Sequence, residues 1–160
     1  MSDADKSLSG RIAALLKPEW IKLELAAKQK NAALHEVADL LAGSPSVGNF
    51  DAFFREILER ERISNTALGH DIAIPHARTD HCKDILIAIG RSPEGIDFGA
   101  KDGRPVRLIF LIGTPKAMVT EYLRVVGNLA RLLRQDEIRQ RLLEAPDAAT
   151  FIQIINEGES

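Results

Sequence analysis

Length, composition and charge exclude several classes of protein before any motif is considered. The chain has 160 residues, the size of about one domain, and its single cysteine, Cys82, rules out an intramolecular disulfide. With 21 Lys and Arg against 23 Asp and Glu, the formal net charge of -2 lacks the basic excess typical of nucleic-acid binders. The N-terminus is polar, and no run reaches the roughly 20 apolar residues that cross a bilayer. We therefore expect one cytoplasmic domain without membrane insertion.

The first third of the chain predicts helices on either side of one short strand. A polar lead-in is followed by a helical turn over residues 12–16, which is expected to stop before Pro18 because proline disfavours helical geometry in the preceding residue. Apolar and polar residues alternate over residues 21–25, which predicts a half-buried strand. Apolar residues at helical spacing predict helices over 31–43 and 50–62. The charged end of the second helix is expected to face solvent.

The middle of the chain predicts a sheet, and its end predicts more helices. Two apolar runs of strand length, residues 85–90 and 106–112, lack alternation and are expected to be buried on both faces. A shorter alternating stretch over 72–74 predicts a strand that ends in a shaped loop. A long amphipathic helix is predicted over 122–133, with two shorter helices after it. The residues expected to cap helices are Asn49, Asp136 and Asp147. The element order predicts a single α/β domain with a sheet between helical layers.

Three of the four histidines fall close together, which raises the question of a metal site. The histidines and the possible ligands among them are His70, Asp71, His76, Asp80, His81 and Cys82. Imidazole, carboxylate and thiolate groups do bind zinc and similar ions. However, the spacing matches neither the paired cysteines of structural zinc sites nor the His-Glu-x-x-His helix of zinc hydrolases. We therefore predict no metal site.

A second possibility is nucleophilic catalysis by Cys82. The thiol lies between His81 and Lys83, whose charges could lower its pKa. Adjacent residues on an extended chain point to opposite faces, however, and no oxyanion-hole signature is nearby. A buried, unreactive cysteine is the better interpretation.

The third possibility is that His76 is itself the nucleophile. Pro75 fixes its own φ and stiffens the backbone that leads into the histidine. Neutral imidazole keeps one nitrogen lone pair that can attack phosphorus, and the product is a phosphohistidine. The charge on the transferred group requires partners, which backbone N–H groups of this loop and a guanidinium such as that of Arg60 could supply.

The segment RERISNTALGHDIAIPHA, which begins at Arg60, resembles the active-site signature of one family of phosphocarrier domains. This family is the fructose and mannitol class of enzyme IIA domains of the bacterial phosphoenolpyruvate-dependent sugar phosphotransferase system, which includes the nitrogen-regulatory enzyme IIA proteins. The residues that match its pattern are Arg60, Glu61, Thr66, Leu68, Gly69, Ile72, Ala73, Ile74, Pro75 and His76. The order of predicted elements resembles the family over residues 9–157, which leaves residues 1–8 as the polar lead-in.

The resemblance implies a fold, a reaction and partners. The fold is a central mixed sheet of about five strands with helices on both faces. His76 would accept a phosphoryl group from phosphorylated HPr or its nitrogen-type counterpart, and would pass it to an enzyme IIB or hold it as a regulatory mark. Arg60 would assist the transfer, and no metal or organic cofactor is required. The residues expected to form the phosphate-binding loop are Thr66, Gly69, Pro75 and Ala77.

The chain departs from the family pattern where many members carry a second histidine, early in the long helix. Tyr122 occupies that position, and a tyrosine hydroxyl donates a hydrogen bond but stays neutral. Position 77 is Ala where Gly is common. His70 and His81 are expected at the rim of the site, and His35 on the ordinary surface.

Two functions follow from these observations. The first is a freestanding phosphocarrier, because the length matches one such domain with no IIB or membrane-spanning IIC segment joined to it. The second is a regulatory binding module, similar to the nitrogen-type proteins, that docks on a kinase, channel or transporter with little phosphotransfer. The same lack of a joined segment also favours the second, and so does Tyr122, because it weakens the case for rapid transfer.

Overall fold

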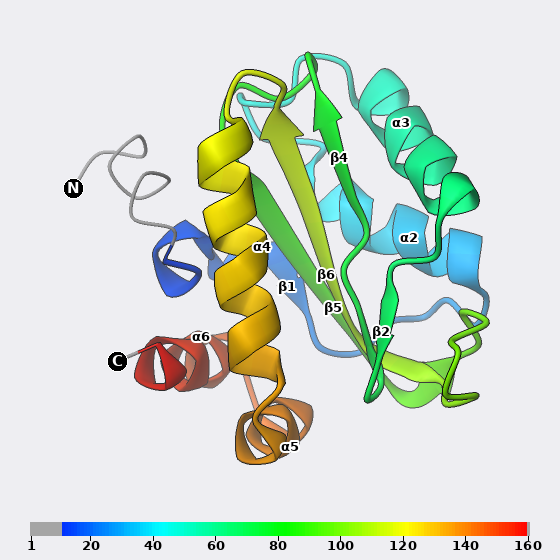
Figure 1. The fold of residues 1–160 in the computed structure, drawn as a ribbon, viewed down its shortest axis with the longest axis vertical. Coiled ribbons are helices and arrows are strands. Elements are labelled where there is room, and N and C mark those ends of the chain that lie inside the picture. The colour runs from blue at the N-terminus through cyan, green and yellow to red at the C-terminus, as the bar shows by residue number, and fades with distance from the viewer. Residues whose placement is uncertain (1–10, 160) are drawn as a thin grey trace.

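A sheet of six strands lies between two layers of helices in the computed structural model, which describes residues 11–159 (Figure 1). The expected lead-in over residues 1–8 lies outside the described residues. The strand order is β1-β5-β6-β3-β2, and β4 also pairs with β6. Parallel and antiparallel pairs both occur, so the predicted mixed sheet is confirmed. The strands are β1 (Ile21–Lys22), β2 (Ala67–Gly69), β3 (Ile72–Ala73), β4 (His76–Thr79), β5 (Leu86–Ile96) and β6 (Val106–Pro115).

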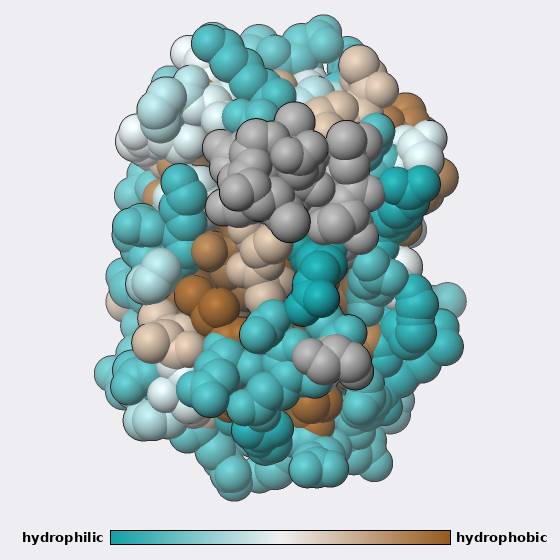
Figure 2. All heavy atoms as spheres, turned by 90° about the vertical axis from the view of Figure 1, so that its left-hand side faces the viewer, coloured by the Kyte–Doolittle hydropathy of each residue, from teal (hydrophilic) through white to brown (hydrophobic). Residues whose placement is uncertain are grey.

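Helices α4, α5 and α6 cover one face of the sheet, and α2 and α3 cover the other (Figure 1). On the side that carries α4 and α6, the surface is mostly hydrophilic (Figure 2). Within residues 11–159, no helix is both long and apolar enough to span a bilayer. The α-helices are α2 (Lys30–Ala38), α3 (Phe50–Ile63), α4 (Val119–Leu133), α5 (Asp136–Glu144) and α6 (Ala148–Gly158). Short 3-10 helices are formed by Ala13–Leu15, Pro18–Trp20 and Asp39–Leu41.

Strands β5 and β6 form the centre of the core because both of their faces are buried. Ile87 and Phe110 pack with the helices on the α4 side, whereas Ala88 and Leu111 pack with α2 and α3. All four side chains are fully buried. Alternate residues therefore serve two separate apolar layers, which explains the near-continuous hydrophobicity of both segments.

A glycine in β6 lets α3 approach the end of the sheet that carries the site. Gly113 pairs with Ala77 of β4 and faces the ring of Phe53 on α3. A Cβ at this position would lie 2.6 Å from a ring carbon of Phe53, which no real contact tolerates. The close packing places α3 beside β4.

Strands β3 and β4 are two parts of one strand that runs alongside β6. Ile72 pairs with Leu108 and His76 with Ile112, so the parallel register against β6 is the same on both sides of the interruption. Pro75 has no N–H to donate, but its carbonyl oxygen accepts from the N–H of Ile112 at 2.9 Å. His76 therefore begins a strand, and the predicted loop after the short strand is only a break within the ladder.

Two of the three predicted helix caps are confirmed. The side chain of Asn49 accepts from the N–H of Ala52, and that of Asp147 accepts from the N–H of Thr150. Asp136 is instead the first residue of α5, after Gln135 at the cap position. There the acidic side chain lies in the first turn, which the helix dipole favours.

The predicted strand over residues 21–25 is shorter than expected. Only Ile21–Lys22 pair regularly with β5. Beyond them, the carboxylate of Glu36 accepts the backbone N–H groups of Ala26 and Ala27, both at 2.9 Å. These bonds tie the segment to α2 and end the strand.

Candidate functional site

His76 is half-buried at the first position of β4, and one hydrogen bond fixes its ring. Its Nδ1 lies 2.9 Å from the carbonyl oxygen of Ile74. Because a carbonyl oxygen can only accept, Nδ1 is the nitrogen that carries the proton, and Nε2 keeps its lone pair. Ile74 bonds on the side away from β6, where its N–H donates to the Thr66 carbonyl oxygen at 3.1 Å, so β6 does not engage its carbonyl oxygen. The hydrogen bond to the Ile74 carbonyl oxygen therefore selects the tautomer in which Nε2 is free.

The surroundings of His76 lower its pKa below the ordinary value of 6.5. Burial is the largest cause, since it disfavours the charged ring, and the positive charge of Arg60 acts in the same direction. The hydrogen bond to Ile74 and the charge of Glu61 oppose the shift without cancelling it. The ring is therefore neutral near pH 7, which a nucleophilic imidazole requires.

His76 lies in an open cleft of about 760 Å³ whose walls come from α3, β4 and the start of α4. Its charged lining residues are Glu56, Glu59, Arg60, Arg78 and Lys116. Its other lining residues besides His76 are Ala77, Val119, Tyr122 and Leu123. Three cations around a nitrogen with a free lone pair form a setting that suits an anionic group.

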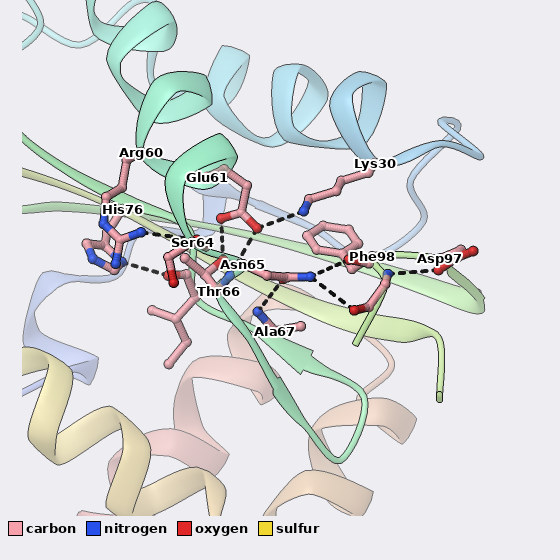
Figure 3. A network of polar contacts seen from close by, with 12 residues as sticks. Lys30, Arg60, Glu61, Ser64, Asn65, Thr66, Ala67, His76, Asp97 and Phe98 are labelled. Atoms are coloured by element: carbon pink, nitrogen blue, oxygen red, sulfur yellow. Dashed lines mark hydrogen bonds and ion pairs between the residues drawn. The ribbon is translucent and has the colours of Figure 1, made fainter. Parts of the chain in front are cut away.

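Arg60 extends from the last turns of α3 toward the imidazole. Its guanidinium lies beside the ring of His76, and its Nη1 donates to the carbonyl oxygen of Ser64 at 3.1 Å (Figure 3). This bond holds the Arg60 side chain near the end of α3, and the charge of Arg60 lowers the pKa of His76. The structure thus brings together the two residues that the motif placed sixteen positions apart in the printed sequence.

Directly after Arg60, a buried carboxylate ties the end of α3 to the following loop. Glu61 accepts from the N–H of Thr66 at 3.1 Å and from its hydroxyl at 2.6 Å (Figure 3). It also pairs with the Lys30 ammonium at 3.0 Å. With only 6 % of its surface exposed, Glu61 is the buried exception at a charged helix end where Glu59 and Arg62 face solvent as expected. The overlooked signal is its spacing from Phe53 and Ile57, which continues the buried stripe of α3.

Asn65 extends this network to the loop after β5. Its Nδ2 donates to the carbonyl oxygens of Phe98 at 2.5 Å and Gly99 at 3.2 Å (Figure 3). Its Oδ1 accepts from the N–H of Ala67 at 2.9 Å. The segment between α3 and β2 is therefore fixed at several points, and so is the base of the Arg60 side chain.

Tyr122 lies in the first turn of α4, opposite His76 across the cleft. The centroids of the two rings are 5.6 Å apart, and their planes make an angle of 42°. Burial raises the pKa of the Tyr122 hydroxyl, and the charges of Arg60 and Arg78 oppose that shift. The hydroxyl therefore stays protonated and can donate one hydrogen bond into the cleft.

Only one of the four residues expected to form a phosphate-binding loop lines the cleft. Ala77 lines the cleft, but Thr66, Gly69 and Pro75 do not. The hydroxyl of Thr66 is committed to Glu61, and Pro75 is buried with its carbonyl engaged by Ile112. Gly69 ends β2, just before the turn to β3, with φ +85°, which favours glycine. These three residues shape the backbone that leads to His76.

The other two histidines of the cluster do not line the cleft, contrary to the expected rim positions. His70 borders separate hollows near Arg104 and Arg134, and His81 lies in the turn after β4. Residues 11–159 contain no group of three or more His, Cys, Asp or Glu side chains placed to hold a metal ion. Burial raises the pKa of the Cys82 thiol to about 12, so Cys82 is not a thiolate.

The turn before β3 contains a second buried carboxylate that the motif did not indicate. Asp71 adopts φ +70°, in the left-handed region, and has 4 % of its surface exposed. Arg104 contacts one of its oxygens at 2.9 Å and Arg107 contacts the other at 2.5 Å. The backbone N–H of Arg107 also donates to the Asp71 carbonyl oxygen at 2.8 Å. These bonds hold the turn against the loop that enters β6.

Comparison with known proteins identifies relatives along almost the whole chain. Residues 14–158 match the family model described as phosphoenolpyruvate-dependent sugar phosphotransferase system, EIIA 2. The chain is 36% identical over 146 residues to the PTS system fructose-specific EIIA component of Haloferax volcanii, covering 91% of this chain and 95% of that protein. It is 36% identical over 149 residues to the fructose-specific EIIABC component of Bacillus subtilis, of which it spans 24% while 93% of this chain is matched.

Nitrogen regulatory proteins are also similar to this chain. The one from Pseudomonas aeruginosa is 30% identical over 145 residues, with 91% of this chain and 94% of that protein covered. The crystal structure of IIA-Ntr from Neisseria meningitidis superimposes with a TM-score of 0.84 at 31% identity, covering 89% of this chain and 97% of that one. IIA mannitol in complex with phosphorylated IIB mannitol, both from Escherichia coli, shares the fold at 23% identity with a TM-score of 0.77, covering 89% of this chain and 97% of that one.

Proposed function

This chain belongs to the EIIA 2 family of the phosphoenolpyruvate-dependent sugar phosphotransferase system, and from that premise we propose that it is a cytoplasmic phosphocarrier in which His76 is phosphorylated. The donor is phosphorylated HPr or its nitrogen-type counterpart, and the acceptor is an enzyme IIB. One observation carries the proposal: the Nδ1 of His76 is held on the Ile74 carbonyl oxygen, with the ring in an open cationic cleft. That arrangement supports attack by Nε2.

The transfer conserves atoms and charge. The lone pair of Nε2 attacks the phosphorus of the donor's phosphohistidine, and a new N–P bond forms. The P–N bond of the donor breaks, and its electron pair returns to the donor nitrogen. Positive charge develops on the His76 ring, where the Nδ1–H bond to the Ile74 carbonyl stabilises it. The same steps in reverse deliver the group to the acceptor.

Arg60 and Tyr122 have different roles in this mechanism. The Arg60 guanidinium supports the negative charge on the phosphoryl oxygens and helps to keep His76 neutral before attack. The Tyr122 hydroxyl donates one hydrogen bond to a phosphoryl oxygen from the opposite wall. It adds no positive charge, so this chain relies on arginine for charge stabilisation.

The rim of the cleft supports docking of a protein partner. Val119 and Leu123, one turn apart on α4, are 39% and 61% exposed beside the cations of the cleft. Exposed apolar side chains next to a nucleophile are a typical feature of a transient protein interface. The structure of IIA mannitol with phosphorylated IIB mannitol describes such a partnership for a protein of the same fold.

A second candidate function is a regulatory binding module that docks on a kinase, channel or transporter. Tyr122, at the position of the usual second histidine, favours slow transfer and a long-lived mark on His76. Relatives named nitrogen regulatory protein add support. In this case the phosphorylated and unphosphorylated states of His76 present different charges in the same cleft.

Phosphoryl transfer from labelled phosphoenolpyruvate tests the proposal. The chain is incubated with enzyme I and HPr, or with their nitrogen-type counterparts, and acid-labile label on the protein is measured. We expect label on the wild type and on His70→Ala, a matched control outside the cleft, and none on His76→Ala. A wild type that takes label from neither set overturns the phosphocarrier assignment. If it also binds a kinase or transporter from lysate, the binding module is supported.

A further inference from the structure

Arg78 is a cation of the cleft to which the sequence motif assigns no role. It lies two residues after His76 on β4, where exposed and buried side chains alternate. Residues two apart on a strand share one face and have Cα atoms about 6–7 Å apart. Both side chains line the same cleft. The Arg78 side chain is therefore long enough to reach a phosphoryl group bound to His76.

Within residues 11–159, Arg78 differs from the other two cations of the cleft because it has no hydrogen bond or ion pair. Arg60 is engaged by the Ser64 carbonyl oxygen at 3.1 Å, and Lys116 pairs with Asp80 at 3.5 Å. A guanidinium in a cleft next to a nucleophile can take up an anion without first breaking a protein contact.

The opposite wall of the cleft shows where the charge of Arg78 acts. The positive charges of Arg60 and Arg78 both act to lower the pKa of the Tyr122 hydroxyl. The positive charge of Arg60 also lowers the pKa of His76. Arg78 therefore acts within the cleft that Tyr122 and His76 both line. A phosphoryl group on Nε2 would occupy the same cleft that both guanidinium groups line.

We propose that Arg78 is a second catalytic arginine, whose guanidinium contacts the phosphoryl oxygens on His76 and provides the positive charge that Tyr122 cannot. This inference rests on the proposed function of His76. Arg60 and Arg78 both contact the phosphoryl group, and Tyr122 donates one hydrogen bond. Planar guanidinium groups match the geometry of phosphoryl oxygens better than the ammonium of lysine does.

The test must separate contact with the phosphoryl group from contact with a protein donor. Single-turnover phosphorylation is measured with phosphorylated HPr and with the small donor phosphoramidate, whose P–N bond breaks to release ammonia. We expect Arg78→Gln to lower the maximal rate about ten- to hundredfold with both donors, with little change in the HPr concentration at half-maximal rate. Arg78→Lys should restore part of the rate. Lys28→Gln, which removes an exposed ion pair with Glu94 outside the cleft, is the matched control and should stay within about twofold of wild type.

Each other result overturns the inference. Arg78→Gln with a higher half-saturating HPr concentration but an unchanged maximal rate makes Arg78 a docking residue. Wild-type rates in Arg78→Gln with both donors leave the phosphocarrier function standing but remove Arg78 from it. A wild type that is phosphorylated by neither donor overturns the function and the inference together. Because Arg78 is exposed, circular dichroism of Arg78→Gln should match that of wild type.

Discussion

The ring of His76 faces the ring of Tyr122 across the cleft, with 5.6 Å between their centroids. The two side chains come from β4 and α4, which the sheet brings together. One ring has a free nitrogen lone pair, and the other has a neutral hydroxyl. The pair can therefore form and support a phosphohistidine, but only one of its members can become positively charged near neutral pH.

Substitution of Tyr122 should change the rate of phosphoryl transfer in both directions. Tyr122→Phe removes one hydrogen bond to the phosphoryl group, which is worth about 1 kcal/mol, so we expect about a fivefold slower single turnover. Tyr122→His introduces a group that can carry positive charge, and we expect transfer faster than wild type. Rapid-quench measurement of label on His76 checks both. Equal rates in Tyr122→Phe and wild type would show that the hydroxyl does not contact the group.

The pKa of His76, measured by NMR titration of its ring, should lie below 6.5. Arg60→Gln should raise the midpoint, because the charge of Arg60 is one cause of the lowered pKa. A midpoint at or above 6.5 in the wild type contradicts this account of the site.

The lowered pKa of His76 makes the free energy of unfolding depend on pH. Its pKa is lower in the folded chain than in the unfolded chain, so the unfolded state binds the proton more readily. The contribution of His76 to stability is therefore complete above pH 6.5 and is lost as pH falls through the lowered pKa. In urea denaturation, His76→Gln should show a smaller loss of stability than wild type over that window. An identical pH dependence in both would contradict the shift.

Glu61 should contribute more to stability than its neighbour Glu59. Glu61→Gln removes the charge that Lys30 contacts and turns one acceptor for Thr66 into a donor, so we expect a loss of about 1–3 kcal/mol in unfolding free energy. Glu59→Gln, in an exposed pair with Arg62, should change it by less than about 1 kcal/mol. Urea denaturation compares the two. A Glu59→Gln loss as large as that of Glu61→Gln would show that the buried network is not the stabilising element.

Asp71 offers a test of backbone strain in the turn that leads to β3. Glycine and alanine at this position both lose the contacts to Arg104 and Arg107. Alanine also retains the cost of φ +70°, which is about 1–2 kcal/mol for a residue with a Cβ. Asp71→Ala should therefore be less stable than Asp71→Gly by about 1 kcal/mol, with gains in unfolded-state entropy for glycine offsetting part of the difference. An alanine variant as stable as the glycine variant would mean that the turn rearranges.

Hydrophobic patterning was sufficient to predict the centre of the fold. The runs that became β5 and β6 read as doubly buried strands because Ile87 and Ala88, for example, serve opposite apolar layers. The Asn49 and Asp147 caps followed from local chemistry alone. The break between β3 and β4 could not be predicted, because it depends on which residues of β6 lie alongside.

Prediction of the site was limited by its long-range contacts. The motif around Arg60 and His76 indicated a nucleophile and one cation, and the structure places both in one cleft with Tyr122. The motif assigned no role to Arg78, since its place beside the cleft comes from β4 pairing with β6. Glu61 looked solvated because its partner Lys30 lies on another helix. Thr66 was expected to bind phosphate because it matches the family pattern, but its hydroxyl is bound to Glu61 five positions earlier.

The central claim is that Nε2 of His76 carries the phosphoryl group, and NMR of the phosphorylated chain tests it most directly. The protein is labelled with nitrogen-15 in histidine, phosphorylated with phosphoenolpyruvate, enzyme I and HPr, and examined for phosphorus–nitrogen coupling. The account predicts coupling to Nε2 of His76, with Nδ1 still protonated, and no phosphorus signal from His76→Ala. Coupling to Nδ1, or phosphorus on any other residue, would contradict it.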